Sequence, residues 1–382
     1  MTLRVCAVTG ARADFGLLRP VLRALRDDGR FELQLVATGA HLSHEFGFTI
    51  TNVEDEGFAV DERVEMLLSS DTPVGITKSL GLATIGFADS LARLQPDLMV
   101  LLGDRYEILA AAQAALVARI PVAHLSGGDV TEGAIDDAMR HAITKLSHLH
   151  FVTNPDAGRR VRQMGEDPER VILAGNPALD DLVNFDPLPT SVLERELGLE
   201  LRARNLLVTY HPVTLADEPP EETFRDLLAA LDDLGSEIGI VLTLPNADTW
   251  GRVLLDMTRE FAAERANAVA HESLGQVRYW SCLKTFDAIV GNSSSALLEA
   301  PAVATPAVNV GVRQRGRLQA ASTINCAAER HAIRVAIEQA LAWEKVPEDS
   351  PYGDGHATAR IIEVLASLED PRRLVSKRFH PT

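Results

Sequence analysis

Short apolar runs alternate with longer helix-like stretches along the whole chain. In the first half, strand-like runs occupy residues 3–8, 33–38, 98–102, 121–125, 150–153 and 171–174. Helix-like stretches lie between them, as at residues 17–26, 108–118 and 136–146. Strands that read as continuous apolar runs and are separated by helical crossovers indicate a parallel sheet buried on both faces. The first half is therefore expected to form a doubly wound, Rossmann-like α/β domain.

The pattern lapses around residues 184–190, where two prolines bracket a polar segment, and then begins again. The second series of strand-like runs covers residues 206–209, 240–244, 268–271, 288–290 and 307–310. A chain of 382 residues also exceeds the size at which one hydrophobic core usually keeps growing. We expect two Rossmann-like domains, residues 1–180 and 181–355, with a hinge within 175–205. The C-terminal segment 356–382 contains a helical stretch that either belongs to the second domain or crosses back to the first.

Composition and charge exclude several classes of protein. The chain is 46% hydrophobic and 24% charged, as in ordinary globular proteins, and its apolar runs are too short to span a bilayer. A formal net charge of −17 argues against nucleic-acid and anionic-membrane partners, although a few local arginines can still bind a small anion. Cys6, Cys282 and Cys326 form no ligand-type pair, and the N-terminus leads directly into a strand without a signal region. These features predict a cytoplasmic protein without structural disulfides.

Polar side chains follow the strands of the first half, where open α/β sheets bind their ligands. After the first strand, Gly10 and Arg12 precede a helix. This turn either offers backbone N–H groups and a guanidinium to an anion or is a routine turn beside a surface arginine. The strand at residues 98–102 is followed by Asp104 and Arg105. This pair either caps the next helix or provides a catalytic acid or base, Asp104, which Arg105 holds ionised while it faces the ligand.

An acidic, glycine-rich loop follows the strand at residues 121–125. Residues 126–137 read Ser-Gly-Gly-Asp-Val-Thr-Glu-Gly-Ala-Ile-Asp-Asp. Three glycines among so many acids predict a flexible loop near the floor of the binding cleft. Asp129 and Glu132 have no evident structural role, which makes them candidates for catalysis.

The two carboxylates that end this loop, Asp136 and Asp137, suit the first turn of the next helix. Arg140 and His141 stand four residues after them and could form local ion pairs with both. A structural role is therefore well supported for at least one of these aspartates.

The second half places polar residues after its own strands. His211 and Asn246 follow two of them, and the placement favours a functional histidine over a structural one. Residues 291–295, Gly-Asn-Ser-Ser-Ser, follow a buried strand and open a helix. One serine could be a simple N-cap, but three offer hydroxyls and N–H groups to a diphosphate. Glu299, one to two turns into that helix, could accept hydrogen bonds from ribose hydroxyls.

A compact basic loop completes this half. Residues 311–317 read Gly-Val-Arg-Gln-Arg-Gly-Arg and follow the next strand, where phosphate charge would need neutralising. Together with the serines and Glu299, the loop is typical of a nucleoside-diphosphate site.

These motifs, in this order, resemble the hydrolysing UDP-N-acetylglucosamine 2-epimerases of the sialic-acid and legionaminic-acid type. The resemblance spans nearly the whole chain. Its motifs lie at residues 12–14, 103–105, 127–129, 136–145, 211–214, 245–246, 291–294 with Glu299, 311–314 and 352–355. The helix at residues 136–145, Asp-Asp-Ala-Met-Arg-His-Ala-Ile-Thr-Lys, favours the hydrolysing branch over the non-hydrolysing one.

The resemblance implies a glycosyltransferase-B-like fold, two Rossmann-like domains facing a cleft, without a metal or another cofactor. It assigns the UDP part to Arg12, His211, Asn246, His271, Ser293, Ser294, Glu299 and Arg313. It assigns the chemistry to Asp104 and the acidic loop. The catalytic candidates are therefore Asp104, Asp129, Glu132 and Asp136, together with His211 because of its place after a strand. Many members carry a glutamate where this chain has Ser126, so either Asp129 or Glu132 takes over that role or the substrate differs. Related enzymes are usually homodimers or homotetramers.

The expected reaction begins with loss of the diphosphate from C1 of the sugar. The oxocarbenium-like centre makes the C2 proton acidic, a carboxylate removes it to leave a glycal, and water then adds at C1 while a proton returns to C2 from the other face. A glycosyltransferase of the same fold, a non-hydrolysing 2-epimerase and an inactive nucleotide-sugar sensor are the alternatives. The sequence leaves open uridine or guanosine as the base, and N-acetylglucosamine or a 2,4-diacetamido trideoxy sugar as the hexose.

Overall fold

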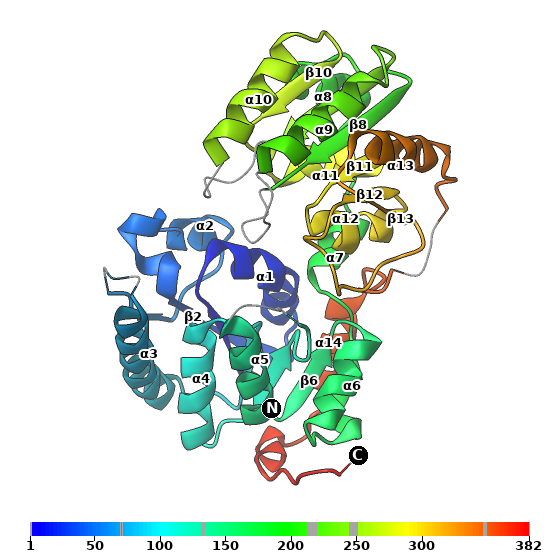
Figure 1. Ribbon diagram of the computed structural model, residues 1–382. Coiled ribbons are helices and arrows are strands. Elements are labelled where there is room, and N and C mark those ends of the chain that lie inside the picture. Colours follow the sequence, from blue (N-terminus) through cyan, green and yellow to red (C-terminus); the bar gives the residue numbers. More distant parts are fainter. Residues whose placement is uncertain are drawn as a thin grey trace. The chain divides into compact units, whose positions relative to one another are not determined.

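The computed structural model describes residues 2–68, 70, 72–130, 135–211, 220–243, 251–346 and 350–381. The chain forms two compact units (Figure 1). Unit 1 comprises Met1–Asp181 and Gly355–Thr382, and unit 2 comprises Leu182–Asp354.

Unit 1 is built on a seven-stranded sheet with the order β3-β2-β1-β4-β5-β6-β7, in which neighbouring strands are parallel. Its strands are β1 (Leu3–Thr9), β2 (Phe31–Thr38), β3 (Glu62–Val64), β4 (Leu98–Leu102), β5 (Val122–Leu125), β6 (Leu149–Val152) and β7 (Val171–Leu173). Its helices are α1 (Arg12–Asp27), α2 (Ile50–Asp55), α3 (Pro73–Leu94), α4 (Tyr106–Val117), α5 (Ile135–Leu146), α6 (Pro155–Gln163) and α14 (Ala357–Ala366), and α7 (Ala178–Val183) spans the boundary with unit 2. The doubly wound parallel sheet predicted from the apolar runs is confirmed.

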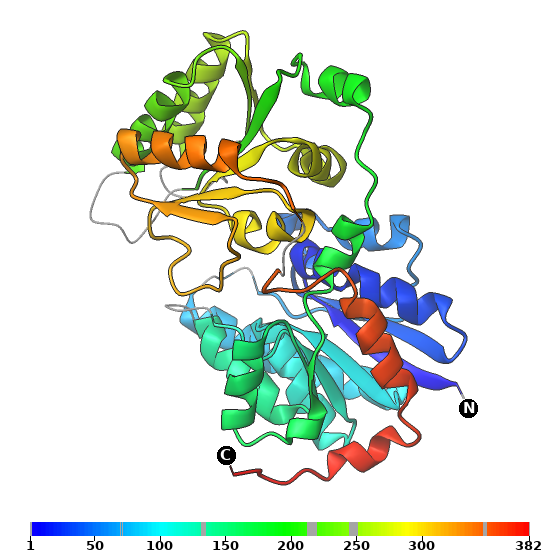
Figure 2. The same cartoon turned by 90° about the vertical axis from the view of Figure 1, so that its right-hand side faces the viewer.

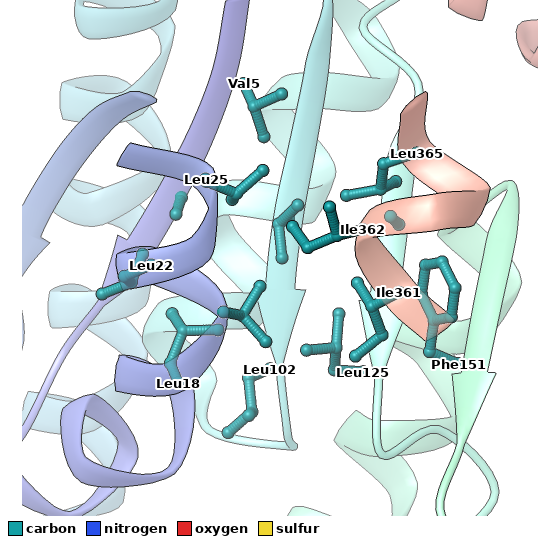
Figure 3. Close-up of a cluster of buried hydrophobic side chains, with 14 of the residues drawn as sticks. Val5, Leu18, Leu22, Leu25, Leu102, Leu125, Phe151, Ile361, Ile362 and Leu365 are labelled. Atoms are coloured by element: carbon teal, nitrogen blue, oxygen red, sulfur yellow. The ribbon is translucent and has the colours of Figure 1, made fainter. Parts of the chain in front are cut away.

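The core of unit 1 follows from helical and strand periodicity. Leu18, Leu22 and Leu25 recur on one face of α1 and are fully buried against the strands. Figure 3 shows them with Val5 of β1 and with residues of α14 in one cluster of apolar side chains. Because the strands are covered on both faces, their backbone ends are the natural place for a ligand.

Helix α14 packs in this core although it lies more than 170 residues beyond the end of β7 in the chain (Figure 2). Ile361 and Leu365 are fully buried. The N-terminus of α14 is held by Asp180, whose carboxylate accepts hydrogen bonds from the backbone N–H groups of Ala357 at 3.0 Å and Thr358 at 2.5 Å. An acidic side chain at this position satisfies N–H groups that have no partner within the helix.

Unit 2 contains a six-stranded parallel sheet with the order β10-β9-β8-β11-β12-β13. Its strands are β8 (Arg204–Thr209), β9 (Ile238–Thr243), β10 (Ala268–His271), β11 (Ala288–Gly291), β12 (Ala307–Val310) and β13 (Thr323–Cys326). Its helices are α8 (Thr190–Leu197), α9 (Pro220–Asp232), α10 (Gly251–Ala263), α11 (Gly275–Thr285), α12 (Ser295–Leu298) and α13 (Arg330–Ala342). The edge strands β3 and β13 were not expected, because they are short and partly exposed and so lack a continuous apolar run.

The described part of the chain has no helix long and apolar enough to cross a membrane. The three cysteines are free.

Candidate active site

Asp104 lies just beyond the carboxyl end of β4 and forms an ion pair with Arg140 of α5. Gly103 makes the turn before it with a φ of +83°, and its N–H donates to the carbonyl of Leu125 at 3.1 Å. A second terminal nitrogen of Arg140 donates to the carbonyl oxygen of Ser126, 2.8 Å away. Arg140 therefore joins the ends of β4 and β5 and orients the Asp104 carboxylate.

The start of α5 differs in part from the expected pattern of local ion pairs. His141 contacts Asp137 at 3.5 Å, which confirms the pair expected for these two residues. The pair expected between Arg140 and Asp136 is wrong, because Arg140 is paired with Asp104 on another element. Arg140 is buried, so its side chain turns inward to a carboxylate at the sheet edge, whereas Asp136 stays half-buried in the first turn of the helix.

Arg105 does not hold Asp104, so that interpretation is also wrong. Its Nε donates instead to Oε1 of Glu107 in the first turn of α4, at 2.6 Å. Glu107 is 1% exposed, and the motif analysis did not single it out. A glutamate in the first turn of a helix reads as an ordinary dipole partner, so no local signal marked it as unusual.

Asp129 has structural hydrogen-bond partners that the sequence did not indicate. Its Oδ1 accepts hydrogen bonds from Oγ1 of Thr153 at 2.7 Å and from Nδ2 of Asn154 at 2.9 Å. Asn154 in turn caps α6 by accepting from the N–H of Ala157. Burial raises the pKa of Asp129, against the opposing effects of these hydrogen bonds and of nearby arginines. A carboxylate in this environment can carry a proton that it donates to a ligand.

His124 of β5 supports the turn that carries Asp104, and sequence analysis missed it. The side chain is fully buried, its Nε2 lies 2.8 Å from the carbonyl oxygen of Gly103, and its Nδ1 lies 3.2 Å from Oγ1 of Thr144. Burial lowers the pKa of His124 to about 3, so the ring is neutral. A neutral ring can donate to the Gly103 carbonyl and accept from the threonine hydroxyl, which fixes the turn before Asp104.

Arg12 is the first residue of α1 and is exposed at the end of β1. The turn before it is held by Asp14, which accepts hydrogen bonds from the N–H groups of Gly10 at 2.7 Å and Ala11 at 2.6 Å. Two of the N–H groups of this turn are thus already satisfied from within the protein. Glu132, the other loop candidate, lies outside the described residues.

In unit 2, Asn292 connects residues that follow three neighbouring strands. Its Oδ1 accepts from the N–H of His211 at 2.7 Å, and its Nδ2 donates to the carbonyl of the same residue at 2.8 Å. Its own carbonyl oxygen accepts from Nη1 of Arg313 at 3.1 Å and from Nε2 of Gln314 at 2.8 Å. Asn292 is fully buried and brings His211 and Arg313 to the same edge of the sheet. The signal in the sequence is an asparagine that directly follows an apolar, strand-like run and its glycine.

The serine segment forms a shorter helix than expected. Helix α12 covers only Ser295–Leu298, and Glu299 ends it. Glu299 lies four residues after the first helical residue, just over one turn, which agrees with its expected place one to two turns into the helix. Ser293 and Ser294 are half-buried before the helix. Ser295 is buried, and its hydroxyl accepts a hydrogen bond from the hydroxyl of Tyr279 at 2.8 Å. Two serines, rather than three, are thus placed to face a ligand.

Glu299 is held by Nε1 of Trp280, which donates to its Oε1 at 3.0 Å. Burial raises the pKa of Glu299, while its hydrogen bonds with Ser295 and Trp280 oppose that rise. His271 ends β10, and its Nε2 lies 3.0 Å from the carbonyl oxygen of Leu197. Asn246 lies outside the described residues.

The candidate residues thus form two sets, each at the carboxyl edge of one sheet. Unit 1 gathers Arg12, Asp104, Arg105, Asp129 and Asp136. Unit 2 gathers His211, His271, Ser293, Ser294, Glu299 and Arg313. The first set can move protons between carboxylates and a ligand, and the second offers hydroxyls, a guanidinium and a carboxylate to a nucleotide.

Comparison with known proteins places the chain in a family. Residues 23–366 match the family model of UDP-N-acetylglucosamine 2-epimerase. The chain is similar to the GDP/UDP-N,N'-diacetylbacillosamine 2-epimerase (hydrolyzing) of Campylobacter jejuni, with 38% identity over 323 residues that make up 84% of each chain. It is also 31% identical, over 377 residues and 99% of each chain, to the UDP-N,N'-diacetylbacillosamine 2-epimerase (hydrolyzing) of Legionella pneumophila.

Among solved structures, the fold is similar to that of UDP-GlcNAc 2-epimerase from Neisseria meningitidis bound to UDP-GlcNAc. The TM-score is 0.79 at 18% identity, and the match covers 96% of this chain and 100% of that one. At this identity the likeness establishes the fold, with its two Rossmann-like halves.

Proposed function

The chain belongs to the UDP-N-acetylglucosamine 2-epimerase family, and we propose that it is a hydrolysing 2-epimerase that converts a UDP-N-acetylhexosamine into UDP and the free C2-epimerised sugar. The observation that carries the proposal is its 31% identity over 99% of its length to a relative whose name specifies the hydrolysing reaction. The carboxylates at the edge of the unit 1 sheet supply the acid and base that such a reaction needs.

Asp104 and Asp129 have environments suited to different tasks. Asp104 is oriented by the positive charge of Arg140, which suits a carboxylate that accepts a proton. Asp129 has a pKa raised by burial, which suits a group that gives one up. Two titratable groups whose surroundings differ in this way are the usual pattern of an acid and base pair. Glu132 and Asp136 remain candidates for the same step.

The proposed chemistry breaks the bond between C1 of the sugar and the diphosphate oxygen, which leaves with the electron pair. Asp104 then removes the C2 proton, and the electrons of that C–H bond form the C1–C2 double bond of a glycal. The second carboxylate gives its proton to C2 from the opposite face while water adds to C1. The proton that this water loses returns to the second carboxylate, and Asp104 releases the proton taken from C2 to the solvent. Ser293, Ser294 and Arg313 would stabilise the departing diphosphate, and His211 stands beside them. The acid and the base of such a reaction each raise its rate by about 10²–10⁴-fold.

The nature of the sugar is the next proposal. The two relatives above are named for N,N'-diacetylbacillosamine, so we propose a 2,4-diacetamido trideoxy hexose as the substrate, linked to UDP. A panel of UDP-N-acetylglucosamine and the UDP- and GDP-linked diacetamido sugars tests this. Turnover should be highest with the UDP-linked diacetamido sugar, and a clear preference for UDP-N-acetylglucosamine would redirect the proposal to that substrate.

Incubation of the protein with the nucleotide-sugar alone separates this function from a glycosyltransferase. An epimerase should release UDP and the epimerised sugar without an acceptor, whereas a transferase or a sensor should not. In heavy water the product should carry one deuterium at C2, and its absence would exclude the glycal route. The Asp104→Asn variant should bind UDP normally and lose turnover by about 10²–10⁴-fold. Near-wild-type turnover would remove Asp104 from the chemistry.

The cellular setting is proposed on the same basis. We expect a homo-oligomeric enzyme of the cytoplasm that serves the biosynthesis of a sialic-acid-like sugar. In it, unit 1 supplies the acid and base, and unit 2 supplies most of the residues that bind the nucleotide. Sedimentation of the purified protein tests the oligomeric state, because a purely monomeric species would contradict it.

A further inference from the structure

Glu107 is a buried carboxylate for which the proposed mechanism has no use. Its Oε1 accepts a hydrogen bond from Nε of Arg105 at 2.6 Å. Its Oε2 is inaccessible to solvent and has no hydrogen-bond partner within the described part of the chain. An unpaired buried carboxylate oxygen costs folding free energy, so stability alone does not explain a glutamate here.

The surroundings of Glu107 are shaped to admit it. A Cβ atom on Gly10 would lie 2.7 Å from both Cγ and Oε1 of Glu107, and one on Gly39 would lie 3.4 Å from Oε1. Gly39 also has a φ of +57°, and its Cβ would meet the carbonyl oxygen of Gly10 at 2.9 Å. Two glycines therefore leave the space that the carboxylate fills, under the turn between β1 and α1.

The charges around Glu107 also favour a role other than stability. Asp14, a second buried carboxylate, is close enough that its charge contributes to a raised pKa for Glu107, after the larger effect of burial. Arg105 is the cation that lowers the pKa of both carboxyl groups. Two buried carboxyl groups thus lie near one arginine: Glu107 contacts Arg105, and Asp14 is close enough to interact with its charge. The side chain of Arg105 is itself 48% exposed.

Among the described residues, the Arg105 guanidinium forms a hydrogen bond through one of its three nitrogens. Nε is bonded to Glu107, whereas Nη1 and Nη2 make no hydrogen bond to any residue that the structure describes. Arg105 lies between β4 and α4, next to Asp104 in the chain. It is therefore at the edge of the sheet where the candidate catalytic residues lie. Two parallel N–H groups in a fixed plane match the oxygens of a phosphate.

From this geometry we infer that Glu107 is a positioning residue, which holds the Arg105 guanidinium so that its two terminal nitrogens bind a phosphate group of the nucleotide diphosphate. The inference rests on the proposed function for the identity of the ligand. Glu107 does not touch the ligand and acts entirely through Arg105.

A double-mutant cycle on UDP binding by the full-length protein tests the inference. Glu107→Gln keeps the size and the Oε1 acceptor but removes the charge, and it should weaken UDP binding by about 5- to 20-fold. Arg105→Gln should weaken binding by about 10- to 100-fold. In the Arg105→Gln background, Glu107→Gln should cause no further loss.

Thermal unfolding separates positioning from a structural effect. Glu107→Gln should shift the unfolding midpoint by no more than about 3 °C, because it removes a poorly compensated buried charge. Glu62→Gln is the matched control, since Glu62 accepts from Nε of Arg93 at 2.7 Å on another part of unit 1. It should leave UDP affinity unchanged.

Three results would overturn the inference. One is unchanged UDP affinity in Glu107→Gln, and another is the same fold-loss in both backgrounds, which would mean that Glu107 acts other than through Arg105. The third is a wild-type protein that binds no UDP, which would overturn the proposed function as well. If UDP binds and the cycle closes as expected but no nucleotide-sugar is hydrolysed, the proposed function fails and the role of Glu107 stands.

Discussion

Replacement of Glu166 by glutamine is expected to destabilise unit 1 by about 3 kcal/mol at pH 7. The carboxylate lies just before the short turn that leads into β7 and is 3% exposed. It accepts hydrogen bonds from Nε2 of His150 at 3.0 Å, from Nζ of Lys377 at 2.9 Å and from Nζ of Lys145. Lys377 belongs to the C-terminal tail, so the cluster connects that tail to β6 and α5.

The magnitude and its sign follow from the pKa of Glu166. Burial alone would raise this pKa, but the hydrogen bonds from His150, Lys145 and Lys377 outweigh burial and lower it from 4.5 to about 2. At about 1.4 kcal/mol per pKa unit, the shift corresponds to about 3 kcal/mol. Because the folded-state pKa is depressed, this stabilisation is complete above pH 4.5 and is lost as the pH falls towards 2. The difference between wild type and variant should shrink over the same range.

Hydrogen exchange followed by mass spectrometry measures the effect where it arises. Peptides covering β6 and β7 should exchange about 100-fold faster in Glu166→Gln at pH 7, and the ratio should approach one near pH 2. The chain's tryptophans, at positions 250, 280 and 343, all lie in unit 2, so their fluorescence reports the stability of that unit separately. Glu169→Gln, an exposed change three residues away, is the control. A ratio below about threefold at pH 7, or one that persists undiminished to pH 2, would refute the electrostatic reasoning.

Three further predictions concern the site. Gly291→Ala should destabilise unit 2 by about 3 kcal/mol or more in urea unfolding, because the new Cβ would lie 1.9 Å from a β8 carbonyl oxygen at a φ of +138°; a loss below 1 kcal/mol would contradict this. Trp280→Phe removes the hydrogen-bond donor to Glu299, so it should lower the free energy of unfolding by about 1–3 kcal/mol and weaken UDP binding. Unchanged UDP affinity would remove Glu299 from the nucleotide site. His124→Gln should make the free energy of unfolding depend less steeply on pH below pH 6.5. The pKa of His124 is lowered to about 3, so wild type loses about 1.4 kcal/mol per pH unit from this group between pH 6.5 and 3, and parallel profiles for the two proteins would contradict the assignment.

The fold could be predicted from the sequence because it depends on local periodicity. Each apolar run marked a strand to within one or two residues, as for β4 (Leu98–Leu102), which was predicted without error. Parallel order followed from the helices between the runs, and with it the edge where polar residues gather. The short helix α12 is an exception that the sequence also explains. Pro301 lacks an N–H, so the helical hydrogen bond to the carbonyl oxygen of Leu297 cannot form and the helix ends before it.

The pairing of charges at that edge could not be predicted, because it depends on distances across the sheet. Arg140 and Asp104 are 36 residues apart, and no pattern within one helix distinguishes Asp104 from the nearer Asp136. Arg105 and Glu107 are two residues apart, a spacing that does not bring side chains together within a helix. They meet because Arg105 precedes α4 and its backbone is extended, with φ −73° and ψ 153°. From this position its side chain contacts Glu107 in the first turn of the helix. Because Arg105 is paired with Glu107, Asp104, one residue earlier, forms its ion pair with Arg140. The chemistry at this edge therefore depends on where α4 begins, and a change that extends that helix by one residue should disturb both ion pairs at once.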